Sequence, residues 1–131
     1  MVRKNQSDPR HPGLWEVPGG RMKATLEDLD DHIRREVWEE TGTRIEPGRP
    51  FALWQWDLPG EGPETARVHV IAVARMCEPL SVDLATDHRQ PGDHLAEARW
   101  VPIEDLHDYK IIPEMQPAMD DFLAAHARSG G

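Results

Sequence analysis

Three glutamates stand close together in the segment Arg35–Gly42, which reads REVWEETG. On an α-helix, residues three and four positions apart share a face, so Glu36, Glu39 and Glu40 are expected to project from one side of one helix. Carboxylates held this close repel one another unless a cation lies among them, and Mg²⁺ prefers oxygen ligands. The spacing therefore predicts a site for a divalent metal.

An acidic run on a helix is more often a solvated surface, and the helical phase helps to decide between these two interpretations. At about 100° per residue, one apolar stripe is formed by Leu26, Leu29, Ile33 and Val37. Glu40 falls within the arc of that stripe and Glu36 lies at its edge, whereas Glu39 lies further out. Acids beside a core face are partly desolvated, which is unfavourable without a partner. We therefore favour the metal site.

The same segment, together with Pro18-Gly19-Gly20 upstream, resembles the Nudix box. That box consists of a glycine, five residues, a glutamate, seven residues and then Arg-Glu-x-x-Glu-Glu-x-Gly with an aliphatic end. Seven residues separate Glu27 from Arg35, and the later positions fall in register. The chain departs from the box twice, because six residues separate Gly20 from Glu27 and Thr43 occupies the aliphatic position.

The resemblance implies a Mg²⁺-dependent pyrophosphohydrolase, with Mn²⁺ as a substitute, that acts on a small nucleotide-type substrate. The expected substrate is a nucleoside diphosphate linked to another moiety, for example ADP-ribose, or a nucleoside triphosphate. Carried over by position, Glu36, Glu39 and Glu40 are the metal ligands and catalytic acids, and the carbonyl of Gly19 is a further ligand. Which acid accepts the proton of the attacking water stays open.

The resemblance also assigns roles around these acids. Arg35 is expected to brace the catalytic carboxylates by ion pairing. Glu27 is placed in the catalytic set, although a carboxylate at a helix start is also favoured by the helix dipole. Arg21 and Lys23, which follow the glycines, are candidates for contacting the substrate phosphates; exposed loop charges are the alternative.

Two further assignments concern residues outside the box. A further acid from a distant loop is implied by the resemblance, and Asp93 and Glu97 are the candidates. His32 lies one turn before Glu36, and we interpret it as a solvated helix histidine outside the site.

The elements that must position these residues follow from periodicity and turn residues. Strands are expected at 14–17, 51–58, 66–76 and 98–101, and helices at 26–41 and from residue 113 onwards. Thr25-x-x-Asp28 resembles a capping box, and Gly42 is a natural helix end. Trp54 and Trp56 share one side of their strand. We favour core packing against the final helix over stacking on a nucleobase.

The order of these elements fits the Nudix fold over nearly the whole chain, as one domain covering residues 1–131. This is an α+β arrangement, an α/β/α sandwich in which helices flank a mixed sheet. The first strand is expected to be short or missing, because the chain starts within or just after it. Whether the N-terminus is truncated is open.

Composition narrows the partners and the compartment. The net charge of −9 disfavours a nucleic-acid polymer, whose binding needs a basic surface. Metals on the acidic helix would reverse the local field for a phosphate substrate. No apolar run of about 20 residues predicts a membrane span, and no apolar leader is present. The single Cys77 suits a reducing cytoplasm and is expected to fill the core.

Two other classes of protein compete with a hydrolase. One is a non-catalytic Nudix-fold module that senses a nucleotide or supports a complex, and the other is a structural cation-binding domain. Loss of box carboxylates would mark the first, whereas all of them are present here. The oligomeric state is open, and a short first strand is expected to leave a sheet edge at which a homodimer could form.

Overall fold

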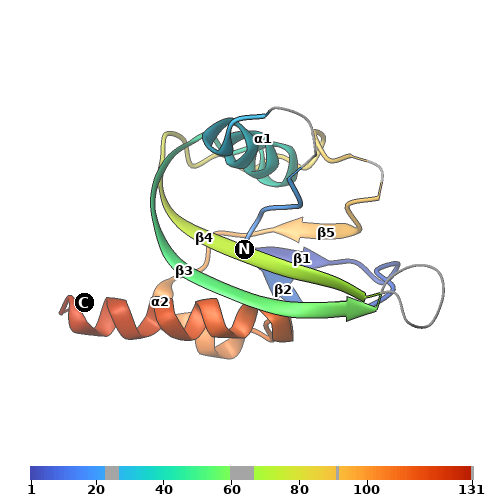
Figure 1. Ribbon diagram of the computed structural model, residues 1–131. Coiled ribbons are helices and arrows are strands. Elements are labelled where there is room, and N and C mark those ends of the chain that lie inside the picture. Colours follow the sequence, from blue (N-terminus) through green and yellow to red (C-terminus); the bar gives the residue numbers. More distant parts are fainter. Residues whose placement is uncertain (23–26, 60–66, 91, 131) are drawn as a thin grey trace. The chain divides into compact units, whose positions relative to one another are not determined.

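The computed structural model describes residues 1–22, 27–59, 67–90 and 92–130. The chain divides into two compact units, which we describe separately (Figure 1). The first comprises Met1–Pro47 and Cys77–Ile112, and the second comprises Gly48–Met76 and Pro113–Gly131.

The sheet of the first unit has three antiparallel strands in the order β2 (Trp15–Glu16), β1 (Val2–Lys4) and β5 (Leu95–Ala98). The side chain of Val2 is fully buried, which fixes the short β1 between its two neighbours. β1 is therefore short, as expected, and it lies between β2 and β5. A parallel bridge between Trp15 and Ile111 makes the strand pairing mixed.

The last strand lies earlier in the chain than predicted, at 95–98 instead of 98–101. Its position is set by pairing with β1, in which Arg3 lies opposite Glu97. Trp100 is consequently outside the sheet and half exposed, and its indole N–H donates to the carbonyl of Val82 at 2.8 Å. A 3₁₀ helix, Ile103–Asp108, follows.

The helix that carries the glutamates is α1 (Leu29–Thr41), which begins later than the predicted position 26. Its N-cap is Asp28, whose side chain accepts a hydrogen bond from the amide of Asp30 at 3.3 Å. Thr25, the other member of the predicted capping box, lies outside the described residues. The predicted end is confirmed, because Gly42 adopts a left-handed conformation with φ of 74°.

The apolar stripe of α1 is narrower than predicted. Val37 is buried and Ile33 is half-buried, but Leu29 is 63% exposed, and Leu26 falls outside the described residues. An apolar cavity of about 220 Å³ lies beside this stripe, and the half-buried Cys77 contributes to its lining.

Strands β3 (Ile45–Pro59) and β4 (Arg67–Pro79) form a two-stranded sheet. Both are longer than predicted. β3 includes Pro47 and Pro50, which is tolerated because both members of a two-stranded sheet are edge strands. Residues 60–66, which include the predicted start of the second strand at residue 66, lie outside the described part of the chain.

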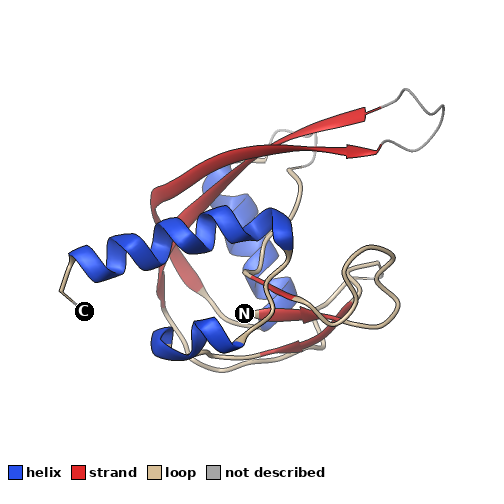
Figure 2. Ribbon diagram, turned by 90° about the horizontal axis from the view of Figure 1, so that it is seen from below, coloured by secondary structure: helices blue, strands red, loops and turns tan. Residues whose placement is uncertain are grey.

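In the second unit, α2 (Gln116–Arg128) follows a 3₁₀ turn at Pro113–Met115 and packs against β3 and β4 (Figure 2). The buried cluster joining them consists of Ala52, Ala74 and Ala118. Trp54 packs against this cluster, and its ring lies 6.0 Å from that of Trp56. Core packing of Trp54 against the final helix is therefore confirmed.

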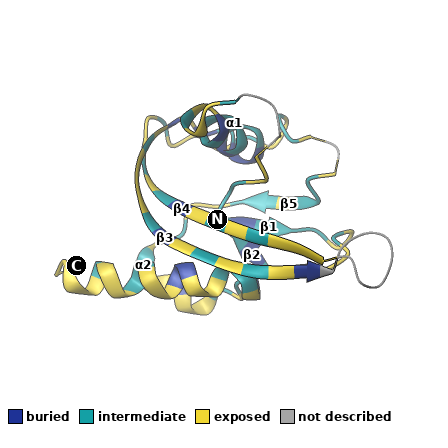
Figure 3. Cartoon of the chain, in the orientation of Figure 1, coloured by how far each residue is buried: buried dark blue, intermediate teal, exposed yellow. Residues whose placement is uncertain are grey.

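Burial differs along the two faces of the hairpin (Figure 3). Leu53, Ile71 and Val73 are exposed by 72%, 67% and 56%, whereas Ala52 and Ala74 are buried. Alternation between exposed and buried positions is the expected period of a half-buried strand. Neither of the helices in the described residues is long and apolar enough to cross a membrane.

Candidate active site

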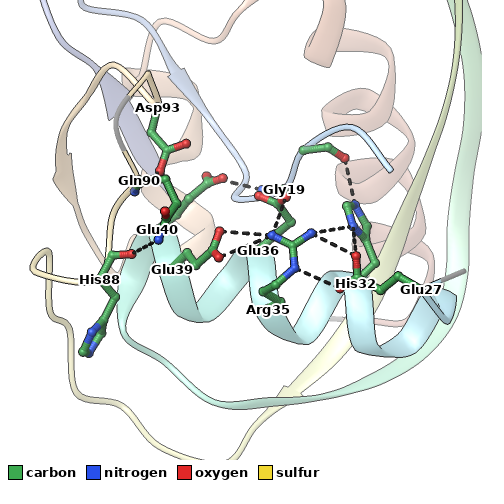
Figure 4. Close-up of polar contacts among 11 residues, drawn as sticks. Gly19, Glu27, His32, Arg35, Glu36, Glu39, Glu40, His88, Gln90 and Asp93 are labelled. Carbon is green, nitrogen blue, oxygen red and sulfur yellow. Dashed lines mark hydrogen bonds and ion pairs between the residues drawn. The ribbon is translucent and has the colours of Figure 1, made fainter. Parts of the chain in front are cut away.

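Helix α1 presents Glu36, Glu39 and Glu40 on one side, as the spacing predicted (Figure 4). All three are largely hidden from solvent. Glu40 is only 5% exposed, and the side chains of Glu36 and Glu39 are each 13% exposed. The acidic face of α1 is thus not a solvated surface.

Glu40 is the most strongly perturbed acid of this face. Burial raises its pKa to about 9, with further contributions from the charges of Glu16 and Glu36. The amide of Gly19 donates to Glu40 Oε1 at 3.4 Å and partly opposes the shift. A carboxyl that holds its proton at neutral pH when no cation is near becomes a charged ligand when a divalent cation replaces that proton.

Arg35 joins the acids of this face into one ion-pair network. Its Nε and Nη2 donate to Glu27 Oε1 and Oε2 at 2.8 and 3.0 Å. Its Nη1 lies 3.2 Å from Glu39 Oε2 and 3.3 Å from Glu36 Oε1. The hydrogen bonds from Arg35 also lower the pKa of Glu27. Arg35 therefore has the contacts of a bracing residue, and it holds Glu27 beside the other acids.

The carboxylates do not yet surround a common point. Among the described residues, no three His, Cys, Asp or Glu side chains form a group that could enclose a metal ion. Glu39 is directed to Arg35, whereas Glu40 receives the Gly19 amide. The donor chemistry nevertheless fits a hard divalent cation, because the face supplies carboxylate oxygens and one of the acids is buried with a raised pKa.

The turn at Gly19 and Gly20 lies directly against the acidic face. A Cβ atom added at Gly20 would lie 2.7 Å from Glu36 Oε2, whereas one added at Gly19 would meet nothing within 4 Å. Gly20 therefore permits a close approach of the backbone to Glu36. Of the two residues predicted to contact the substrate phosphates, Arg21 is exposed and Lys23 lies outside the described residues.

The two candidate loop acids lie in different surroundings. Asp93 is close enough to Glu40 to contribute to its raised pKa. Glu97, in β5, is instead bound by Arg3 and Arg99, with N–O distances of 3.1 and 2.9 Å. The structure thus brings Asp93 to the acidic face and engages Glu97 elsewhere.

Three residues near the acids were not identified from the sequence. Glu16 lies in β2, shortly before the glycine turn; burial raises its pKa, and Lys4 Nζ lies 3.3 Å from its Oε1. Arg89 donates from Nε to the carbonyl of Glu40 at 3.3 Å and from Nη1 to that of Leu95 at 3.2 Å. No periodic signal marks a loop arginine of this kind.

The third is His32, whose assignment as a solvated helix histidine is wrong. It is only 6% exposed, and its Nε2 lies 3.0 Å from the carbonyl oxygen of Gly20. The reason is the approach of the glycine turn to the helix, which covers this face. The sequence did indicate that His32 lies on the face of the acids, because it is four residues before Glu36 and eight before Glu40 on the helix.

One hollow of the first unit lies away from the acidic face. It measures about 580 Å³, and its lining includes Trp15, Arg99 and Tyr109 but none of the α1 glutamates. Arg99 lies over the Trp15 ring, 5.1 Å from its centroid. We therefore identify the candidate site by the chemistry of its side chains and not by this hollow.

Comparisons with known proteins concern the chain as a whole and not its individual site residues. A family model described as NUDIX domain matches residues 1–124. The proteins named phosphatase NudJ from Escherichia coli K12 and Shigella flexneri are each 30% identical over 94 residues, which is 71% of this chain and 54% of the relative. The chain thus spans about half the length of these curated relatives.

A solved structure supports the fold independently. The crystal structure of a MutT protein from Methanosarcina mazei Go1 aligns with a TM-score of 0.63 and 21% sequence identity. The alignment covers 96% of this chain and 82% of that chain. At this identity the likeness concerns the mixed α/β fold alone.

Proposed function

Because the chain belongs to the Nudix family, whose domain model matches residues 1–124, we propose that it is a divalent-metal-dependent hydrolase of a diphosphate linkage. The substrate class is a nucleoside diphosphate linked to another moiety, for example ADP-ribose, or a nucleoside triphosphate. The observation that carries the proposal is the buried carboxyl of Glu40, whose pKa is raised to about 9 beside Glu16 and Glu36.

In this proposal Mg²⁺, or Mn²⁺ in its place, is held by Glu36, Glu39 and Glu40. The Gly19-Gly20 turn lies beside these ligands and can offer the carbonyl of Gly19. When bound, the metal neutralises charge on the phosphoryl oxygens of the substrate and polarises them for attack by water. The positive charge of the metal also offsets the repulsion between an acidic protein and the phosphates of its substrate.

The residues around the ligands have supporting tasks. Arg35 holds Glu27, Glu36 and Glu39 by ion pairs and limits their repulsion. A carboxylate of this set accepts the proton of the attacking water. Asp93 lies close enough to Glu40 to raise the pKa of the Glu40 carboxyl. Asp93 is therefore a further candidate for accepting the proton of the attacking water.

The charge of the protein supports a small substrate over a polymer. A net charge of −9 opposes the many phosphate contacts that a nucleic-acid chain requires. A diphosphate held mainly by metals needs few such contacts. Selectivity then depends on loops that reach the other end of the substrate, and the segment that contains Arg89 and Asp93 reaches the acidic face.

A second candidate is a non-catalytic Nudix-fold module that senses a nucleotide. The observation in its favour is that the described acids do not form a preassembled metal group. It predicts nucleotide binding without turnover. The curated relatives carry the name phosphatase, which favours the hydrolase.

The experiment that separates the two is a product assay by ³¹P NMR on a panel of nucleoside triphosphates and nucleoside diphosphate derivatives with Mg²⁺ or Mn²⁺. The hydrolase proposal expects cleavage of at least one compound between two phosphorus atoms, abolished by chelation and by Glu40→Gln. Glu97→Gln is the matched control, because Glu97 is bound by Arg3 and Arg99. Binding of a nucleotide without any cleavage would support the sensing module instead.

A further inference from the structure

We propose that His32 is a positioning residue that fastens the glycine turn to the Glu27–Arg35 ion pair. In this role His32 fixes the position of the Gly20 backbone relative to Glu36. It also fixes the position of the Arg35 guanidinium relative to the acids that this guanidinium contacts. The catalytic consequence rests on the proposed function, whereas the geometric part does not depend on it.

The ring of His32 contacts both partners with its two nitrogen atoms (Figure 4). Nε2 lies 3.0 Å from the carbonyl oxygen of Gly20, and Nδ1 lies 3.3 Å from Nη2 of Arg35. Glu27 is near as well, with Oε2 at 3.6 Å from Nδ1. One buried ring thus connects residues at both ends of the interval from Gly20 to Glu27, which is one residue longer than in the box.

These contacts specify one tautomer. A carbonyl oxygen only accepts hydrogen bonds, so Nε2 must carry a hydrogen and donate it to Gly20. A guanidinium only donates, so Nδ1 must be without hydrogen and accept from Arg35. The Glu27 oxygen lies farther from Nδ1, at 3.6 Å, than Nη2 of Arg35 does, at 3.3 Å. A ring that makes both of these contacts is neutral and carries its hydrogen on Nε2.

Both partners of His32, the Gly20 backbone and Arg35, lie directly against the acids of α1. A Cβ atom at Gly20 would lie 2.7 Å from Glu36 Oε2, so the position of this backbone decides how much room the Glu36 carboxylate has. Arg35 contacts Glu36 and Glu39 through Nη1, while its Nη2 is the atom that His32 accepts from. Loss of the ring would remove one contact from the glycine turn and one from the guanidinium at once.

Two substitutions divide these contacts between them. The amide of His32→Gln reaches the position of Nε2 and can still donate to the Gly20 carbonyl. The shorter His32→Asn places its amide oxygen near Nδ1, where it can accept from Arg35, but it cannot reach Gly20. We consider the contact with the Gly20 carbonyl to be the more important of the two. His32→Gln, which keeps this contact, should therefore impair metal binding less than His32→Asn.

The first measurement is a Mn²⁺ titration of the metal-bound fraction by electron paramagnetic resonance, which needs no substrate. We expect His32→Asn to weaken Mn²⁺ binding about 10-fold, a size typical for loss of a group that orients ligands, and His32→Gln to stay within about 3-fold of the unaltered protein. In turnover assays the Asn variant should lower kcat more than it raises KM, because the substrate contacts are unchanged. Equal effects of the two substitutions, or none, would overturn the proposal.

The second measurement reads the tautomer directly in the metal-free protein, by long-range ¹H–¹⁵N correlation of the histidine rings. The signal of His32 is assigned by its loss in His32→Gln. We expect a neutral ring protonated at Nε2; a ring protonated at Nδ1, or a doubly protonated one, would contradict the contacts. This result stands even if the Asn variant fails to fold. If the protein cleaves nothing but the tautomer and Mn²⁺ results hold, only the proposed function fails.

Discussion

Arg35 binds both oxygens of the Glu27 carboxylate, with Nε–Oε1 and Nη2–Oε2 distances of 2.8 and 3.0 Å. This two-point ion pair keeps Glu27 beside the acids of α1 although six residues separate it from Gly20. The planar guanidinium is suited to such pairing, because its parallel N–H groups match the two carboxylate oxygens.

Replacing Arg35 by lysine should therefore not be conservative. A lysine ammonium cannot bind Glu27 at two points while also contacting Glu36 and Glu39. We expect Arg35→Lys to lower kcat/KM about 10- to 100-fold, as typical for loss of a group that orients metal ligands.

Its neighbour offers the matched control. Arg34 pairs with Asp31 and Glu46 on the surface, both at 3.0 Å, and touches none of the catalytic acids. Arg34→Lys should leave kcat/KM within about 2-fold, since exposed pairs contribute little. Equal losses in the two variants would show that Arg35 has no special bracing role.

Glu27 should matter less than Glu40. In Glu27→Gln, Arg35 keeps its contacts with Glu36 and Glu39, so the ligands remain neutralised. We expect Glu27→Gln to lose much less activity than Glu40→Gln when both are assayed at saturating metal. A loss as large as that of the Glu40 variant would place Glu27 among the groups that act on the substrate.

The raised pKa of Glu40 predicts how the metal-free protein responds to pH. Above pH 4.5, the ordinary value for this group, the unfolded chain loses the proton, whereas the folded chain keeps it until about pH 9. Because the unfolded state then binds fewer protons, stability falls as pH rises through this window. The contribution of this single group is at most about 1.4 kcal/mol per pH unit.

Chemical unfolding of the chelated protein between pH 5 and pH 9 checks this, using the difference between the unaltered chain and Glu40→Gln. The variant lacks the titrating group, so its advantage in the free energy of unfolding should grow with pH. A difference that stays constant, or that shrinks as pH rises, would mean that Glu40 is ionised in the metal-free protein.

Local features of this site could be predicted from the sequence, and long-range ones could not. The face shared by Glu36, Glu39 and Glu40 follows from helix geometry, and the stop at Gly42 follows from its freedom to adopt positive φ. The burial of His32 could not be read in the same way. It depends on the carbonyl of Gly20, twelve residues away, approaching the helix.

Strand positions likewise depend on long-range contacts that local sequence features do not predict. The predicted strand at 98–101 was wrong because the bounds of β5 are set by pairing with β1, which brings Arg3 opposite Glu97. No local propensity encodes that register. Arg89 was missed for the same reason, since its contact with the Glu40 carbonyl spans 49 positions of the chain.

The two glycines of the turn should respond differently to alanine. A Cβ at Gly20 would force the Glu36 carboxylate to move, because the two would be 2.7 Å apart, whereas Gly19 has open space. We expect Gly20→Ala to weaken Mn²⁺ activation about 10-fold or more, and Gly19→Ala to change it less than about 3-fold. Comparable values for the two variants would show that Glu36 can move aside without consequence for the metal.

The central claim is that the acidic face of α1 binds the divalent metal. The most direct test is a Mn²⁺ titration by electron paramagnetic resonance of the unaltered protein, Glu40→Gln and the control Glu97→Gln. We predict that the unaltered protein and the control bind Mn²⁺ with similar affinity, and that Glu40→Gln binds it at least about 10-fold more weakly, because a buried charged ligand is lost. Equal Mn²⁺ affinity in Glu40→Gln and the unaltered protein would contradict the account.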